Sequence, residues 1–156
     1  MSELYPLLRL VHILSSGVLF GGGAVIAYFM LTGWRSGKLN EFYFAARFTV
    51  TADFLFTTTA VIVQPVSGVM LAISAGYSLF EPWLLASYAL YVLIGICWLP
   101  VVWIQLRVRN QLAEAGEGGA IPDATHKLMR YWFWLGWPAF TALIGIFALM
   151  ITKPIF

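Results

Sequence analysis

The sequence predicts an all-α integral membrane protein, an antiparallel bundle of four transmembrane helices. Hydrophobic residues make up 61% of the 156-residue chain and charged residues only 10%, whereas a soluble domain carries about 25% charged residues. Four separate apolar runs are long enough to cross a bilayer, and short polar segments connect them. Short connections favour up-down-up-down packing of neighbouring helices.

The four runs cover approximately residues 7–31, 48–73, 83–106 and 128–151. A spanning helix needs about 20 apolar residues, and backbone groups in hydrocarbon must bond within their own segment, which predicts helices. The first run is too long for the apolar core of a signal peptide and is expected to remain as a span. Residues 1–156 are therefore expected to form a single transmembrane domain.

Basic residues predict the orientation in a bacterial cytoplasmic (inner) membrane. Seven of the nine Lys and Arg residues lie in or beside the first and third connections, and the other two, Arg9 and Lys153, lie near the termini. Because positive charge concentrates on the cytoplasmic side, both termini are expected on the non-cytoplasmic side. The net charge of +2 gives no reason to expect nucleic acid as a partner; the lipid bilayer is the expected one.

His12 is the first candidate for a functional residue, because ionisable groups inside a membrane span are costly and usually mark a site. Ser16, one helical turn later, shares its face. The functional interpretation is a ligand to haem iron or a proton-transfer group. The alternative is a histidine bonded to a neighbouring helix or to interfacial water.

Four other residues are expected at the same membrane depth as His12. Met70 and Met150 are candidates for a second axial ligand, since Met/His ligation of haem is an established pattern, although methionine also fills gaps in cores. Arg9 and Lys153 could pair with the carboxylates of a tetrapyrrole, or simply extend to the membrane surface. The suspected cofactor is haem b.

Three further polar residues fall within or beside the spans. Asp53 has Arg47 nearby, which favours a structural ion pair or a water contact. Gln64 lies mid-span before Pro65 and is expected to bridge to another helix. His126 is expected as a solvated interface residue, most of a bilayer away from His12, so both cannot bind one iron within one chain.

Gly17 and Gly21 have the small-xxx-small spacing that lets helix backbones approach closely. This spacing predicts packing against a partner helix, either in a homo-oligomer or in a larger assembly. The sequence has no HExxH, no phosphate-binding glycine loop and no CxxC. Hydrolase and ATPase functions therefore have no support.

Short segments in a shared order resemble the HemJ-type protoporphyrinogen IX oxidases. The segments are Leu10-Val11-His12-Ile13-Leu14, Val63-Gln64-Pro65-Val66-Ser67-Gly68, Trp83-Leu84-Leu85-Ala86-Ser87 and Met150-Ile151-Thr152-Lys153-Pro154. The chain is also similar throughout its length to a family of uncharacterised four-helix bacterial integral membrane proteins. The oxidase resemblance implies a helical bundle that binds haem b or a porphyrin, with His12 as the matching histidine. The chain departs from the oxidases at one position, because Ser87 stands where they have a functional lysine.

The leading hypothesis is thus a small membrane haem-binding or redox protein with His12 as axial ligand. The alternative is a non-enzymatic assembly or scaffold subunit that packs through Gly17 and Gly21. A weaker alternative is a protoporphyrinogen oxidase-like enzyme in which another group replaces the lysine missing at Ser87. Whether the protein is an enzyme stays open at this stage.

Overall fold

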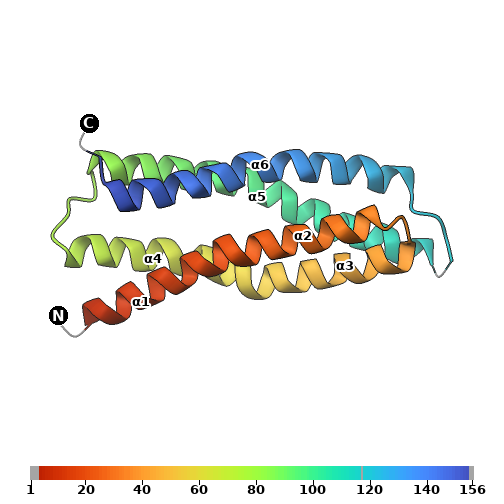
Figure 1. The fold of residues 1–156 in the computed structure, drawn as a ribbon, viewed down its shortest axis with the longest axis horizontal. Coiled ribbons are helices and arrows are strands. Elements are labelled where there is room, and N and C mark those ends of the chain that lie inside the picture. The colour runs from red at the N-terminus through yellow and green to blue at the C-terminus, as the bar shows by residue number, and fades with distance from the viewer. Residues whose placement is uncertain (1–3, 117, 155–156) are drawn as a thin grey trace.

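The computed structural model describes residues 4–116 and 118–154, and these residues form four long helical spans (Figure 1). The first span comprises α1 (Leu4–Gly17), a π-helical segment η1 (Val18–Gly22) and α2 (Gly23–Arg35). The second comprises α3 (Leu39–Ala52), a π-helical segment η2 (Asp53–Thr57) and α4 (Thr58–Ser74). The third is α5 (Pro82–Ala115) and the fourth is α6 (Asp123–Thr152). The predicted fold class is confirmed.

Each span is longer than the hydrocarbon core of a bilayer requires. The spans contain 32, 36, 34 and 30 residues, and about 20 residues suffice to cross. The helices therefore extend beyond the apolar runs, most clearly where α5 continues to Ala115. Large apolar side chains such as Val25, Ile96 and Ile151 remain exposed, which is the surface that lipid requires.

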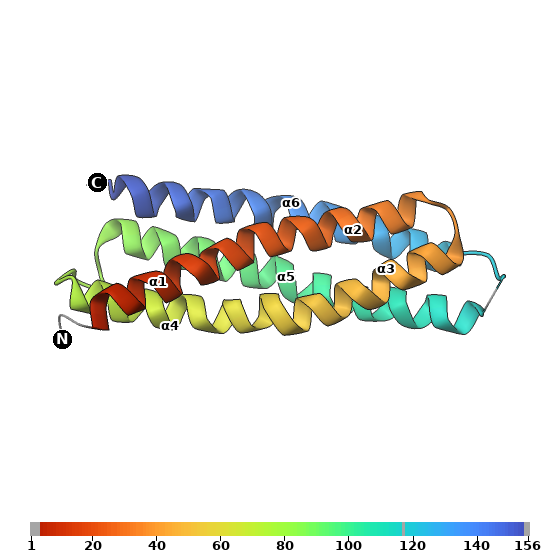
Figure 2. The same ribbon diagram turned by 60° about the horizontal axis from the view of Figure 1, so that its bottom comes forward.

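The spans run antiparallel, and both ends of the chain lie at the same end of the bundle (Figures 1 and 2). α1 packs on α4, α2 on α3, α3 on α5, and α5 on α6. The main apolar core lies in the half of the bundle nearer the first and third connections, around Met30, Phe42, Val108 and Met129. A smaller cluster of Ala72, Trp83 and Leu84 lies at the end where the chain begins and ends.

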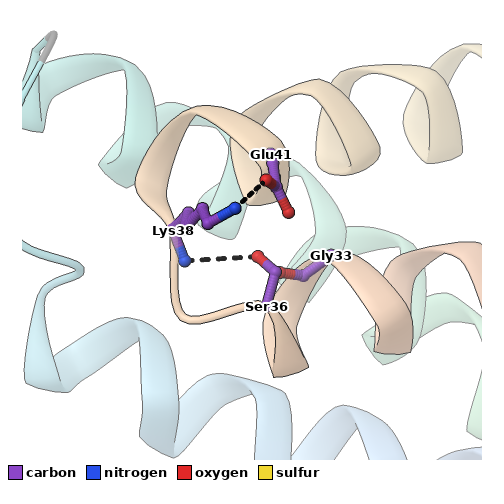
Figure 3. A network of polar contacts seen from close by, with 4 residues as sticks. All are labelled: Gly33, Ser36, Lys38 and Glu41. Atoms are coloured by element: carbon purple, nitrogen blue, oxygen red, sulfur yellow. Dashed lines mark hydrogen bonds and ion pairs between the residues drawn. The ribbon is translucent and has the colours of Figure 1, made fainter.

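The first connection is shorter than the sequence analysis placed it, because α3 already begins at Leu39. Figure 3 shows how the turn is closed: the Lys38 backbone N–H donates to Ser36 Oγ at 3.2 Å, and Lys38 Nζ meets Glu41 Oε1 at 2.7 Å. The hydrogen bond to Glu41 raises the pKa of Lys38. A Cβ on Gly33 would overlap the Cβ of Ala45, so glycine lets α2 and α3 approach closely.

The two irregular helix segments are not at the prolines. Pro65, Pro100 and Pro138 each lie inside a helix that continues on both sides. The π-helical hydrogen bonding occurs instead in η1 and η2, which contact each other near the middle of the bundle. Such single π turns are frequent at functional sites, and both segments contribute residues to the cavity described next.

Candidate functional site

A cavity of about 370 Å³ lies between the four spans. Leu19 and Ala24 come from the first span, Val61 from the second, Ile94 from the third and Leu143 from the fourth. Aromatic side chains form much of the remaining wall: Tyr28, Tyr91, Trp98, Trp132, Phe133, Trp137 and Phe140. A mainly apolar cavity of a few hundred Å³ with a few polar groups is typical of small-molecule sites.

Buried polar atoms without hydrogen-bond partners are concentrated at this cavity. Six such side-chain atoms occur in the described part of the chain, and five belong to residues that line it. The five residues are Asp53, Thr57, Trp98, Gln105 and Trp132. The sixth, Thr49, lies one helical turn before Asp53. Native proteins pair nearly all buried polar groups, so this concentration needs an explanation.

Asp53 is the central member of this group. Its side chain is 4% exposed, and its Oδ2 has no hydrogen-bond partner. Thr57, Trp98 and Gln105 are the polar side chains that face its carboxyl group. Asp53 is the first residue of η2, and single π turns inside α-helices are frequent at functional sites.

Of the two contacts expected for Asp53, an ion pair with Arg47 or a water contact, the ion pair does not form. Among the described residues the one ion pair is Lys38–Glu41, while Arg47 is exposed with its guanidinium 5.6 Å from the centre of the Tyr43 ring. Residues six apart on a helix do not share a face, whereas those three or four apart do. Asp53 therefore lies in the bundle without a basic neighbour, because no Lys, Arg or His lines its cavity.

His12 is part of a separate polar cluster between α1 and α4. Its Nδ1 lies 3.0 Å from Ser67 Oγ, and its Nε2 lies 3.2 Å from Gln64 Nε2. Ser15 Oγ donates to Gln64 Oε1, and Ser67 Oγ donates to the Val63 carbonyl at 2.7 Å. A neutral imidazole protonated on Nδ1 satisfies all of these contacts, and this assignment follows from the network.

Gln64 thus bridges to another helix, as the sequence predicts. Ser16 does not join the cluster, because its hydroxyl donates to the Ile13 carbonyl of its own helix at 2.7 Å. The serine that joins the cluster is Ser15, which donates to Gln64 Oε1. Gly68 makes room for the ring, since a Cβ there would lie 3.0 Å from His12 Cε1.

The other suspected haem residues are dispersed around this end of the bundle. Met70 is 46% exposed, and Arg9 is exposed as well. Met150 packs on the cluster of Ala72, Trp83 and Leu84. Lys153 Nζ donates to the Tyr77 hydroxyl at 3.0 Å and lies 4.6 Å from the centre of the Tyr77 ring.

No hydrogen bond or ion pair among the described residues joins these four to His12. The hydrogen bond from Nδ1 suits a ligating histidine, because it fixes the ring orientation. The Gln64 amide, however, occupies the position that iron would take at Nε2. Haem binding through this set of residues stays a prediction, and it requires Gln64 to turn away.

The remaining candidates are also placed by the structure. Trp34 Nε1 donates to His126 Nδ1 at 2.8 Å, so this histidine is hydrogen-bonded to another span. Its side chain is half-buried. Ser87 is buried and donates to the Trp83 carbonyl of its own helix at 2.8 Å. A Cβ on Gly17 or Gly21 would meet nothing within 4 Å. Oligomer formation through these glycines stays a prediction.

Comparison with known proteins gives the family. A family model described as "Predicted integral membrane protein (DUF2269)" matches residues 6–154. The chain belongs to this family. No curated protein and no solved structure matches it. The family description gives a membrane location and no activity, so the functional assignment depends on the chemistry of the two polar clusters.

Most of the cavity is not predicted by the sequence. Asp53 stands out as an ionisable group within a span, but nothing connects it with Gln105, Trp98 and Trp132. One signal was present, since Gln105 is a lone amide in the apolar run at residues 83–106. No signal showed that these side chains meet, because they come from different spans.

Proposed function

We propose that this membrane protein binds a small lipophilic molecule in its central cavity. The observation that carries the proposal is that five side chains lining one apolar cavity within the bundle each have a buried polar atom without a hydrogen-bond partner. Leaving a buried donor or acceptor unpaired costs about 1–3 kcal/mol. A ligand with polar groups of its own would remove this cost for several atoms at once.

The mouth of the cavity supports uptake from the bilayer. Tyr28 and Trp137 line the cavity and are still 72% and 55% exposed. Both belong to helices whose outer surface is apolar, α2 and α6. An opening bordered by such side chains faces lipid rather than water, which suits a molecule that dissolves in the membrane.

Gly136 allows a direct test. It lines the cavity, and a Cβ there would meet nothing within 4 Å, so a larger side chain would fill the space without a clash at its first carbon. Gly95→Leu is a matched control, because Gly95 is equally unobstructed and does not line the cavity. Native mass spectrometry of the protein released from nanodiscs should show a bound small molecule on the wild type and Gly95→Leu. Gly136→Leu should lack it, and an identical bound population on all three would contradict the proposal.

Haem binding through His12 is the second candidate function, in a protein that carries or transfers electrons. Its support is the Ser67 contact with Nδ1, which holds the imidazole as ligating histidines are held. Met70 or Met150 would be the second ligand, and Arg9 and Lys153 would pair with the propionates. A Soret band should appear in purified protein after haem addition and be lost in His12→Ala. Gln64→Ala should strengthen the band by freeing Nε2, and a protein that stays colourless would exclude this candidate.

The proposed orientation places both termini on the non-cytoplasmic side of a bacterial inner membrane. It is supported by the position of Arg35 and Lys38 at the end of the bundle opposite the termini. Cysteines introduced at Ser36 and at Ser78, in the first and second connections, should differ in labelling by an impermeant maleimide added to intact cells. Labelling of Ser78→Cys alone is expected, and labelling of Ser36→Cys alone would reverse the orientation.

A further inference from the structure

We infer that the ligand of the central cavity is a lipophilic organic cation of the alkylammonium type, held by Asp53. This inference rests on the proposed function and names the chemical class of the ligand. Its first support is the charge of the residues that line the cavity. Asp53 is the one carboxyl group among the residues that line the cavity, and none of the lining residues is basic. A buried carboxyl group is stable as a carboxylate only beside a positive partner, and otherwise in its protonated form.

The unpartnered acceptors fit an ammonium group. Asp53 Oδ2, Gln105 Oε1 and Thr57 Oγ1 are all buried and without hydrogen-bond partners. Thr57, Trp98 and Gln105 lie on the donor side of the Asp53 carboxyl, and the side chains of Gln105 and Thr57 are 3% and 7% exposed. A primary ammonium has three N–H donors and no acceptor, so it suits Asp53 Oδ2 and the other unpartnered oxygens of the cavity.

The walls suit the rest of such a molecule. Tyr91, Trp98 and Trp132 are among the aromatic residues lining the cavity that holds Asp53. Aromatic faces attract cations, most strongly where water is excluded, and proteins use aromatic cages to bind quaternary ammonium ligands. The apolar remainder of the cavity, about 370 Å³ in all, offers space for a hydrocarbon tail.

Two cavity groups would favour a different ligand. Trp98 Nε1 and Trp132 Nε1 are unpartnered donors, which would suit a neutral molecule with oxygen acceptors bound beside a protonated Asp53. The choice between the two ligand classes depends on whether binding requires positive charge, and this can be measured with two probes of nearly identical shape.

The probes are 4-phenylbutylamine, which is cationic at pH 7, and neutral 4-phenylbutan-1-ol. Each is titrated into the full-length protein in nanodiscs of zwitterionic lipid, with tryptophan fluorescence as the readout and empty nanodiscs as the partition blank. The wild type and Gly95→Leu should bind the amine at least tenfold more tightly than the alcohol. Asp53→Asn should lose this preference and still bind the alcohol, and Gly136→Leu should bind neither probe.

Each outcome separates the two claims. If the alcohol binds as tightly as the amine, or Asp53→Asn keeps the preference, the cation assignment is wrong while the ligand-binding function stands. If neither probe saturates on the wild type, both claims fail. Gln105→Leu is a second variant in case Asp53→Asn does not fold. It removes one acceptor and should weaken binding of the amine several-fold, with little effect on binding of the alcohol. Equal effects on the binding of both probes would overturn the assignment.

Discussion

His12 and Asp53 are both ionisable side chains inside the helical spans, yet their surroundings differ. Both ring nitrogens of His12 have partners, in Ser67 and Gln64, and the cluster is closed by Ser15. Asp53 Oδ2 has no partner, and neither do the polar atoms of the neighbouring Thr57 and Gln105. Within the described residues, the first cluster is satisfied by the chain itself, whereas the second keeps buried polar atoms without hydrogen-bond partners.

The two clusters therefore contribute differently to stability and function. A hydrogen bond between spans holds helices together, so the cluster of His12, Ser15, Gln64 and Ser67 joins α1 to α4. Unpartnered buried groups weaken the fold and are kept where a function needs them. Substitutions in the two clusters should therefore change stability in opposite directions.

The largest expected change in the free energy of unfolding is at His12. His12→Leu removes hydrogen bonds to Gln64 and Ser67 and should lower the free energy of unfolding by about 1–2 kcal/mol. The measurement is a denaturation curve in mixed micelles. Ser16→Ala is the matched control and should change little, because Ser16 bonds only its own helix. If the His12→Leu variant is as stable as the wild type, the cluster does not stabilise the fold.

Asp53→Leu should have the opposite sign. It replaces an unpartnered buried carboxyl by an apolar side chain and is expected to raise the free energy of unfolding by about 1 kcal/mol, in the range typical of substitutions that trade function for stability. The same denaturation curve, recorded without added ligand, measures the change. A loss of stability as large as that of His12→Leu would show that Asp53 has a partner within the chain.

Gly68→Ala should have a smaller effect on the complete cluster. The new Cβ would lie 3.0 Å from His12 Cε1, which costs about 1 kcal/mol in overpacking and is partly offset by the better helix propensity of alanine. A net loss near 0.5 kcal/mol is expected. Gly95→Ala, where nothing lies within 4 Å, should gain a similar amount. Equal changes at both glycines would contradict the close contact with His12.

The smallest effect is expected at Lys153, which lies outside both clusters. Its ammonium group rests 4.6 Å from the centre of the Tyr77 ring and 5.6 Å from that of Trp83, at an exposed position. Lys153→Met should lower the free energy of unfolding by about 0.5 kcal/mol. If Lys153 instead serves a haem propionate, the variant should leave stability unchanged and weaken haem binding, which a haem titration would reveal.

The sequence predicted the spans well because hydrophobicity alone decides which segments can cross a bilayer. The helix start at Leu39 was not predicted, since it depends on a three-residue turn and on the close approach of Gly33 to Ala45. Gln64 was expected to bridge to another helix because an amide inside a span needs a partner. Its particular partners, His12 and Ser15, depend on which face of α4 meets α1.

The cavity could not be predicted from the sequence for a similar reason. Asp53 has a basic residue six positions earlier, but its cavity is formed by η2 and by side chains from the three other spans. Trp98 and Gln105 lie seven residues apart on α5 and share a face. Nothing in that spacing indicates which other span they face.

The most direct test of the account uses the indole N–H groups as reporters. Trp98 and Trp132 have unpartnered Nε1 atoms at the cavity, whereas Trp34 Nε1 already donates to His126. In ¹H–¹⁵N NMR spectra of the protein in nanodiscs, adding either phenylbutyl probe should shift the Trp98 and Trp132 indole resonances and leave that of Trp34 in place. Unchanged Trp98 and Trp132 resonances at saturating probe, or equal shifts at all the tryptophans, would contradict a ligand site in the central cavity.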